Sequence, residues 1–361
     1  MTALDDAGWE RVVDAARWHR LTPLLFRRLA GVPDVPAPVL ERLEAAYLAN
    51  VARNLLLTQT LTTVLEQLEA ADVPAVPLKG AALIETVYPD PGLRELLDLD
   101  LLVPLGRIAT AQAALRAAGF EPDTREIPPE HHYHAAALLA PDRRTAVELH
   151  HHLATGAEAA RFDIETLWRR TRVVGGTPSR LVSPPADLLL HVAIHFTRNR
   201  MGARTGGALA QIGDIAWLAG TAAIDWESLV HDVRDYALET RVFLALWCAA
   251  ELGVPIPVDV LSELRPTAFD PAIGHQFLLL RVLRTDEHQL VRSLRRMIAP
   301  ERTTLVVGWK ASSDRWPALA QAYARRARVR VPDVAASLRR PLRQLREYRL
   351  NGQIDALERG D

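Results

Sequence analysis

The sequence predicts an α+β protein: a small mixed β-sheet between a helical N-terminal arm and a mostly α-helical C-terminal half. Apolar residues recur at helical spacing before residue 72 and again after residue 156. Between these parts lie short apolar runs bounded by Gly and Pro, which are typical of buried strands. We therefore expect a helical arm over 1–72, an α/β core over 73–155 and a helical domain over 156–361.

Composition places the chain among ordinary globular proteins. It has 361 residues, 49% hydrophobic and 24% charged, with a net charge of -1. This balance gives no general reason to expect DNA or an acidic membrane as a partner. The single Cys248 excludes an internal disulfide framework, and we find neither a signal peptide nor a membrane span. We expect a cytoplasmic protein.

The N-terminal arm carries two helical patterns. Residues 7–30 have apolar side chains at helical spacing and end at a Gly-x-Pro stop signal. A longer pattern covers 38–71, and the polar Asn54 and Thr58 are its expected interruptions. The arm thus predicts helix, turn, long helix and then entry into the first strand.

The stretch 74–103 is the most informative part of the chain. It starts with an apolar run that indicates a buried strand and leads into Lys79 and Gly80. After a small-residue helical segment and a Pro-rich turn, it closes on Asp98 and Asp100 inside an apolar run. Two carboxylates separated by one residue on a strand project from one face, and side by side they need a cationic partner. Hard oxygen ligands suit Mg²⁺; the alternative is a solvated strand end.

A third carboxylate is predicted to join this pair. After a helical pattern over 106–118, residues 120–130 indicate a loop or an edge strand, and 131–139 and 146–150 indicate two strands around a turn. In the second of these, Glu148 alternates with apolar neighbours and faces away from them. If this strand lies beside the aspartate strand in a mixed sheet, Glu148 faces the same site.

The C-terminal half repeats helical apolar patterns separated by Gly and Pro. The clearest helical patterns cover 187–199, 209–219, 226–237 and 240–253, and further helices follow to residue 361. Arginines gather between 325 and 349. They indicate either a solvated helix face or a surface for RNA or phosphate.

Lys79, Gly80 and Arg94 are candidates for phosphate contacts. Glycine lets backbone N–H groups approach a phosphate, a helix N-terminus favours anions, and a lysine adds a point charge. The alternative for Lys79 is a surface lysine at a turn. Arg94 lies four residues before Asp98, where it could either clamp phosphates or pair with the aspartates. Both roles stay open.

Histidines near Glu148 are candidates for the surroundings of a metal. On a strand, Glu148, His150 and His152 alternate on one face, so His150 could lie next to the metal. No cysteine accompanies them, which speaks against a structural zinc site. The alternative is a structural histidine.

A second polar group lies in the C-terminal half. Asp187, His191, His195 and Asn199 form a stripe at a spacing of four residues on one predicted helix face. The stripe either lines a nucleotide pocket or forms an interior hydrogen-bonded contact. Asp214, on the next helix, could orient His195 through a ring nitrogen.

Several segments together resemble the uncharacterised nucleotidyltransferase family of the polymerase-β-like superfamily. The segments that carry the resemblance are ARN at 52–54, VPLKGAAL at 76–83, YPDPGLR at 88–94, DLDLLV at 98–103, GF at 119–120, VELH at 147–150, and the helices around 190–195 and 214–216. The pairing of LKG with DLDLLV is the most specific part of it.

The resemblance implies a Mg²⁺-dependent (or Mn²⁺-dependent) transfer of NMP, AMP from ATP or NMP from another NTP, to an acceptor. Gly80 then matches the turn that holds the triphosphate. Asp98 and Asp100 match the metal-binding pair, and Glu148 the third carboxylate that completes the metal and catalytic set. Ala81 stands where the superfamily has a serine. The acceptor is not specified; a small molecule, a peptide or a protein is favoured over RNA.

Two other functions are compatible with the same residues. Because Ala81 removes a serine contact to phosphate, a degenerate module that binds a nucleotide or a partner without turnover is one alternative. An ATP-dependent phosphotransferase that uses the same metal site is the other. In the favoured interpretation Lys79 helps to seat the phosphates and Arg94 stabilises the leaving pyrophosphate.

Overall fold

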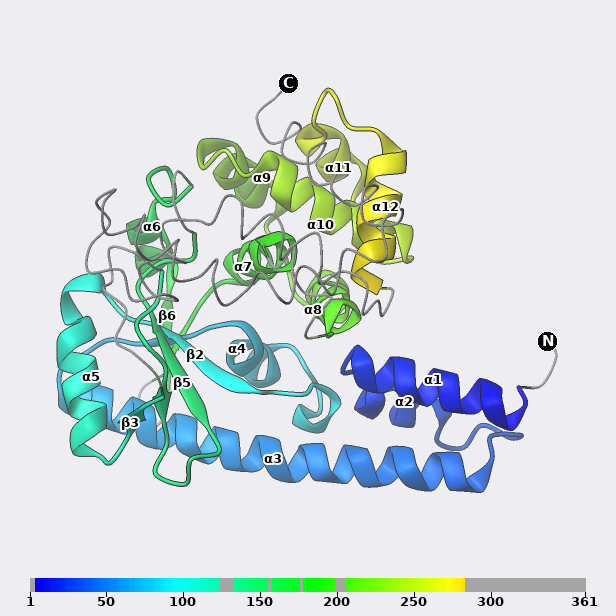
Figure 1. Cartoon of the computed structure of the whole chain (residues 1–361). Coiled ribbons are helices and arrows are strands. Elements are labelled where there is room, and N and C mark those ends of the chain that lie inside the picture. Colours follow the sequence, from blue (N-terminus) through cyan, green and yellow to red (C-terminus); the bar gives the residue numbers. More distant parts are fainter. Residues whose placement is uncertain are drawn as a thin grey trace, which may run out of the picture.

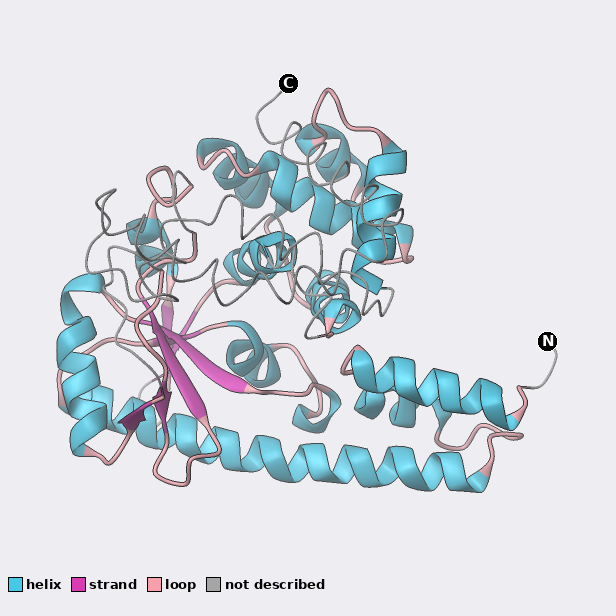
Figure 2. Ribbon diagram, viewed as in Figure 1, coloured by secondary structure: helices cyan, strands magenta, loops and turns pink. Residues whose placement is uncertain are grey.

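The computed structural model describes residues 4–123, 133–154, 158–175, 178, 180–198 and 206–282 (Figure 1). Helices surround a small five-stranded mixed sheet (Figure 2), so the predicted α+β class is confirmed. The arginine-rich segment 325–349, the start of the predicted strand over 131–139, and Asn199 lie outside the described residues. Among the residues described, no helix is both long and apolar enough to cross a membrane.

The N-terminal arm consists of α1 (Asp6–Trp18), α2 (Thr22–Leu29) and α3 (Ala37–Ala70). The single helical run predicted over 7–30 is therefore wrong: Arg20, at φ 57°, adopts a left-handed conformation that separates α1 from α2. Both short helices lie along one end of α3 (Figure 1).

Helix α3 is continuous over its 34 residues, so the predicted interruptions at Asn54 and Thr58 are wrong. The Asn54 side chain is buried, because its amide donates to a neighbouring loop instead of ending the helix. Polar residues in a helix interior are tolerated where they find such partners.

The sheet has the strand order β1-β2-β5-β4-β3, with β2 and β5 parallel and the other neighbours antiparallel. Its strands are β1 (Val76–Pro77), β2 (Asp98–Leu102), β3 (Glu121–Pro122), β4 (Leu138–Leu139) and β5 (Ala146–His150). Asp100 is in register with Glu148. The predicted adjacency of the aspartate and glutamate strands is confirmed.

Side chains of β2 and β5 alternate between two differently covered faces. Leu99, Leu101 and Leu149 pack in an apolar cluster with residues of α3 and α5 (Ile108–Ala117). The opposite face carries Asp98, Asp100, Glu148 and His150, on the side of α4 (Lys79–Thr86) and α7 (Pro185–Arg198). Short 3₁₀ turns, η1 (Pro91–Leu93) and η2 (Leu105–Arg107), lead into and out of β2, and Gly119 at φ 88° follows α5.

Up to residue 282, the described part of the C-terminal half is mostly helical, as predicted, apart from one hairpin that was not predicted; the further helices predicted to residue 361 lie outside the described residues. The hairpin pairs β6 (Arg172–Val174) with β7 (Arg180–Val182). The remaining helices are α6 (Ile164–Arg170), α8 (Ala208–Thr221), α9 (Trp226–Asp235), α10 (Glu239–Glu251), α11 (Val258–Leu264) and α12 (Pro271–Val282). One apolar cluster joins Leu83 and Leu102 of the core to α7 and α10, so packing crosses the predicted boundary at residue 155.

Candidate active site

Lys79 is fixed beside Asp100 by the pairing of β1 with β2. The Leu78 N–H donates to the Asp100 carbonyl at 2.9 Å, which places the next residue, Lys79, over the aspartate. Lys79 has φ 46°, a left-handed conformation that costs a non-glycine residue about 1 kcal/mol. Its Nζ lies 2.7 Å from Asp100 Oδ1, and the two side chains are 14% and 3% exposed. The strained backbone therefore points a buried ammonium at a buried carboxylate.

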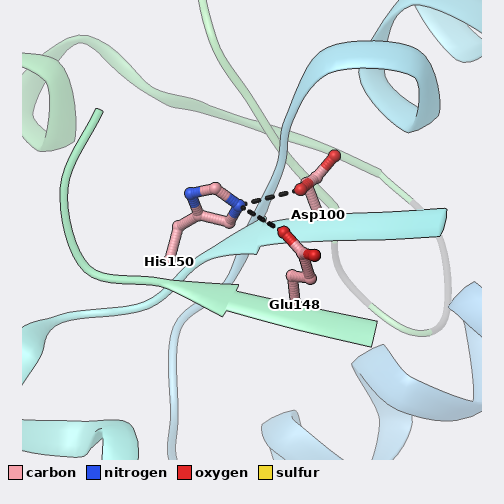
Figure 3. A group of neighbouring side chains, drawn as sticks. All are labelled: Asp100, Glu148 and His150. Carbon is pink, nitrogen blue, oxygen red and sulfur yellow. Dashed lines mark hydrogen bonds and ion pairs between the residues drawn. The ribbon is translucent and has the colours of Figure 1, made fainter. Parts of the chain in front are cut away.

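Asp100, Glu148 and His150 converge from two neighbouring parallel strands (Figure 3). His150 Nε2 lies 2.8 Å from Asp100 Oδ1 and 3.5 Å from Glu148 Oε2. One ligand atom from each residue lies within 4.8 Å of the other two, and this is the group among the described residues with the donor set of a metal site. Two carboxylates and one imidazole suit a divalent cation, so these residues fit a divalent metal.

Asp98 stands next to this group on the same strand face. Burial, together with repulsion from Asp100, raises the pKa of Asp98 to about 6, although Lys79 opposes the shift. In the described part of the chain no side chain or backbone group donates a hydrogen bond to its carboxylate. A half-buried carboxylate in this setting is stabilised by an added cation.

Asp100 is held in the opposite state. Burial alone would raise the pKa of Asp100, but Lys79 and the hydrogen bond from His150 hold it well below its usual range. The site therefore contains one firmly ionised aspartate and one that is easily protonated, two residues apart.

Gly80 makes room for the Arg94 side chain. A Cβ at Gly80 would lie 2.2 Å from Arg94 Nη1 and 2.4 Å from Leu96 Cδ2. Arg94 in turn donates from Nε and Nη2 to the two oxygens of Asp214, both at 2.8 Å, and the Tyr88 hydroxyl donates to Asp214 as well. Arg94 thus pairs with Asp214 of α8 rather than with Asp98 or Asp100, and its ion pair joins the core to α8; the predicted contact of Arg94 with phosphates stays a prediction.

The long helix α3 holds the loop that precedes β2. Asn50 Nδ2 donates to the carbonyls of Gly92 and Arg94 at 2.8 and 3.1 Å. Asn54 Nδ2 donates to Pro91 and Arg94 at 2.6 and 2.7 Å. This positioning role was not predicted; its signal in the sequence is the four-residue spacing of two asparagines on one helix face.

The predicted polar stripe of α7 divides between two places. His191 is 3% exposed, and burial, followed by the positive charge of Lys79, lowers its pKa well below the usual range. Its Nδ1 has no hydrogen-bond partner in the described part of the chain. Asp187, four residues earlier, instead receives a hydrogen bond from Arg170. The orientation of His195 by Asp214 stays a prediction.

Two further predicted neighbours lie away from the carboxylates. Strand β5 ends at His150, so its alternation does not extend to His152, whose Nδ1 accepts from the Ala154 N–H at 2.9 Å. Ala81 is 2% exposed within the apolar cluster under the sheet. A serine at this position would bury its hydroxyl there.

Comparison with known proteins agrees with this geometry. None of the curated proteins matches the chain. One family pattern, described as uncharacterised nucleotidyltransferase, matches residues 5–253, which is more than half of the sequence and contains both strands of the site. The chain therefore belongs to the family of uncharacterised nucleotidyltransferases.

Proposed function

We propose that the protein is a nucleotidyltransferase that depends on a divalent metal and moves an NMP, AMP from ATP in the first instance, to an acceptor hydroxyl. The observation that carries this proposal is the convergence of Asp100 and Glu148 on adjacent parallel strands, with Asp98 beside them. Family membership supports the general reaction class.

Asp98, Asp100 and Glu148 are the proposed metal-binding carboxylates. A divalent metal bound there would neutralise negative charge on the phosphates of the nucleotide and on the leaving pyrophosphate. The three carboxylates fix its place, because their strands are locked in register by the sheet. Asp98, which no described residue neutralises by a hydrogen bond, gains most from such a cation.

The start of α4 is the proposed seat of the phosphates. Its N-cap residue, Leu78, makes no side-chain hydrogen bond to the helix. The Leu78 side chain therefore leaves the first N–H groups of α4 uncapped; they belong to Lys79, Gly80 and Ala81. A helix N-terminus with such groups favours anions, and the Lys79 ammonium adds a full positive charge. We assign Arg94 a positioning role here, because Asp214 engages its guanidinium and Gly80 packs against it.

In the proposed reaction the acceptor oxygen forms a bond to the α-phosphorus, and the bond from that phosphorus to pyrophosphate breaks. Glu148, 26% exposed, accepts the proton that the acceptor hydroxyl loses. His191 and His195 of α7 are the proposed wall of the site on the side of the C-terminal half. Positioning and charge neutralisation supply most of the rate enhancement.

Labelled ATP tests the proposal. The protein is incubated with α-³²P- or γ-³²P-labelled ATP, a divalent metal and pools of small-molecule, peptide and protein acceptors. Label transfer from the α-position supports nucleotidyl transfer. Transfer from the γ-position would replace it by a phosphotransferase. No transfer from ATP, nor from the other three NTPs labelled in the same way, would favour a binding module.

The same assay has a matched pair of variants. Asp98→Asn and Asp100→Asn should each abolish transfer. Asp98→Asn should leave the melting temperature nearly unchanged, whereas Asp100→Asn should lower it, because the buried Lys79 ammonium loses its partner. Asp187→Asn removes another buried aspartate, one that pairs with Arg170, and should keep the activity. Full activity in both site variants would show that the metal assignment is wrong.

A further inference from the structure

We infer that His150 is itself a metal ligand, and that its imidazole makes the site prefer a transition-metal dication over Mg²⁺. The inference rests on the proposed function, because it concerns the same site. It goes beyond that function in adding an imidazole nitrogen to a ligand set of carboxylates.

The direction of the His150 imidazole ring supports its role as a metal ligand. Nε2 is the ring atom that faces both carboxylates, at 2.8 Å from Asp100 and 3.5 Å from Glu148 (Figure 3). The side chain is fully buried, with 0% exposure, so solvent does not compete for this nitrogen. A cation that touches the facing oxygens of Asp100 and Glu148 also meets His150 Nε2, because the three ligand atoms lie within 4.8 Å of one another.

The second argument concerns the proton on the ring. A neutral imidazole carries one proton, and the hydrogen bond made by one nitrogen decides where it resides. Because the ionised Asp100 carboxylate only accepts, Nε2 carries the proton in the metal-free protein, and that proton moves to the buried, unpartnered Nδ1 when a cation replaces the hydrogen bond. Nε2 is thus able to give up its hydrogen bond to Asp100 and present its lone pair to a metal.

The third argument is the chemistry of the donor set. Mg²⁺ is bound almost entirely by oxygen atoms, whereas imidazole nitrogen suits first-row transition metals. With Asp98 as the third ligand the set would be all oxygen and would favour Mg²⁺. The closely gathered group instead contains His150 as its third member. Since Lys79 repels every cation alike, the nitrogen is the feature that discriminates between metals.

Spectroscopy on the unmodified protein tests the inference without turnover. Mn²⁺ is added at one equivalent to the full chain, with and without inorganic tripolyphosphate, which contains no nitrogen. Electron spin-echo envelope modulation then detects a directly bound ¹⁴N. We expect nitrogen modulation from one imidazole, and also tighter binding of Mn²⁺ than of Mg²⁺ by calorimetry.

His150→Gln and His152→Gln form the matched pair of variants. Glutamine places an amide oxygen near the position of Nε2, so His150→Gln should lose the nitrogen modulation and weaken Mn²⁺ binding roughly tenfold or more, while Mg²⁺ binding changes much less. His152 lies two residues further on, where its ring nitrogen accepts from Ala154, and His152→Gln should behave as the parent.

The outcomes separate this inference from the proposed function. Bound Mn²⁺ without nitrogen modulation, no Mn²⁺ binding at all, or an unchanged Mn²⁺-to-Mg²⁺ affinity ratio in a folded His150→Gln variant would each overturn it. If that variant fails to fold, the modulation in the parent protein still decides. Nitrogen modulation without any label transfer would support His150 as a ligand and leave the nucleotidyltransferase proposal as the part that failed.

Discussion

Two groups of acids in this protein each gather around a single cation and differ in geometry. One, called the metal-site cluster because we propose a metal there, contains Asp98, Asp100 and Glu148 around Lys79. The arginine cluster contains Asp187 and Asp232 around Arg170. In each cluster one aspartate, Asp98 or Asp187, has its pKa raised to about 6.

The kind of cation separates the two. Arg170 is a planar donor that binds both oxygens of Asp232 and one oxygen of Asp187. Its Nη2 lies 3.0 Å from Asp232 Oδ1, and its Nη1 lies 3.2 Å from Asp187 Oδ1. Lys79 is a point charge that reaches one oxygen of Asp100 and forms no hydrogen bond with Asp98 or Glu148 in the described chain. A raised pKa therefore does not identify a site, whereas acids left without donors do.

The largest expected effect comes from removing a carboxylate of the metal-site cluster. Glu148→Gln should lower the transfer rate about 10³-fold, because it removes both a metal ligand and the proposed base. Asp232→Asn, in the arginine cluster, should leave the rate within about threefold. Rates are measured by transfer of α-³²P label. Equal losses of transfer rate in the two variants would contradict the proposed difference in function between the clusters.

The second effect concerns the arginine that anchors the start of α4. Gly80→Ala places a Cβ against Arg94 and Leu96, so we expect about 1–3 kcal/mol of destabilisation and a drop in transfer rate. Gly106→Ala is the control, because nothing lies within 4 Å of its added Cβ. Chemical denaturation measures both. A Gly80→Ala variant as stable and active as the control would refute the close packing.

The third effect tests Lys79 as a competing cation. Lys79→Met removes a positive charge 2.7 Å from Asp100 Oδ1, so Mn²⁺ should bind about tenfold tighter while ATP binds more weakly. Lys79→Arg keeps the charge and should not tighten metal binding. Calorimetric titration decides, and an unchanged or lower Mn²⁺ affinity in Lys79→Met would contradict the role of Lys79.

The smallest effect is on stability, in the arginine cluster. Burial raises the pKa of Asp187 to about 6, against the pull of Arg170. This pKa lies above the value of about 4 expected in the unfolded chain, so the folded protein binds the proton more tightly. The stability that protonated Asp187 contributes is therefore complete below about pH 4 and is lost as pH rises through about 6. The parent should therefore lose roughly 1–3 kcal/mol over that range, and Asp187→Asn should not.

The measurement is the free energy of unfolding of both proteins at several pH values. The free energy of unfolding of Asp187→Asn minus that of the parent should rise between pH 4 and pH 7. A flat difference would mean that Asp187 is not desolvated. Taking the difference between the two proteins cancels the contribution that the other acids, including Asp98, make to the pH dependence of stability.

Sequence reasoning predicted the parts of this site that depend on local periodicity. The alternation of Asp98 and Asp100, and of Glu148 among apolar neighbours, follows from strand geometry and was confirmed by the pairing of β2 with β5. The partner of Arg94 could not be predicted in this way, since Asp214 lies 120 residues away. Arg20 was missed because its left-handed conformation breaks a helix without Gly or Pro.

The β6–β7 hairpin was missed for a related reason. Its strands are three residues each, too short for alternation to emerge from a helical background. Asn54 was read as a helix interruption because its partners, the carbonyls of Pro91 and Arg94, belong to a loop about 40 residues away. Contacts between distant segments, rather than propensity, decided these features.

The most direct test of the account is a crystal structure of the protein with Mn²⁺ and a non-hydrolysable ATP analogue. Anomalous difference density locates the metal independently of any fitted coordinates. The account predicts a Mn²⁺ peak between Asp100, Glu148 and His150, with the triphosphate at the start of α4. Density for the metal elsewhere, for example at Asp187 and Asp232, with none at β2 and β5, would contradict it.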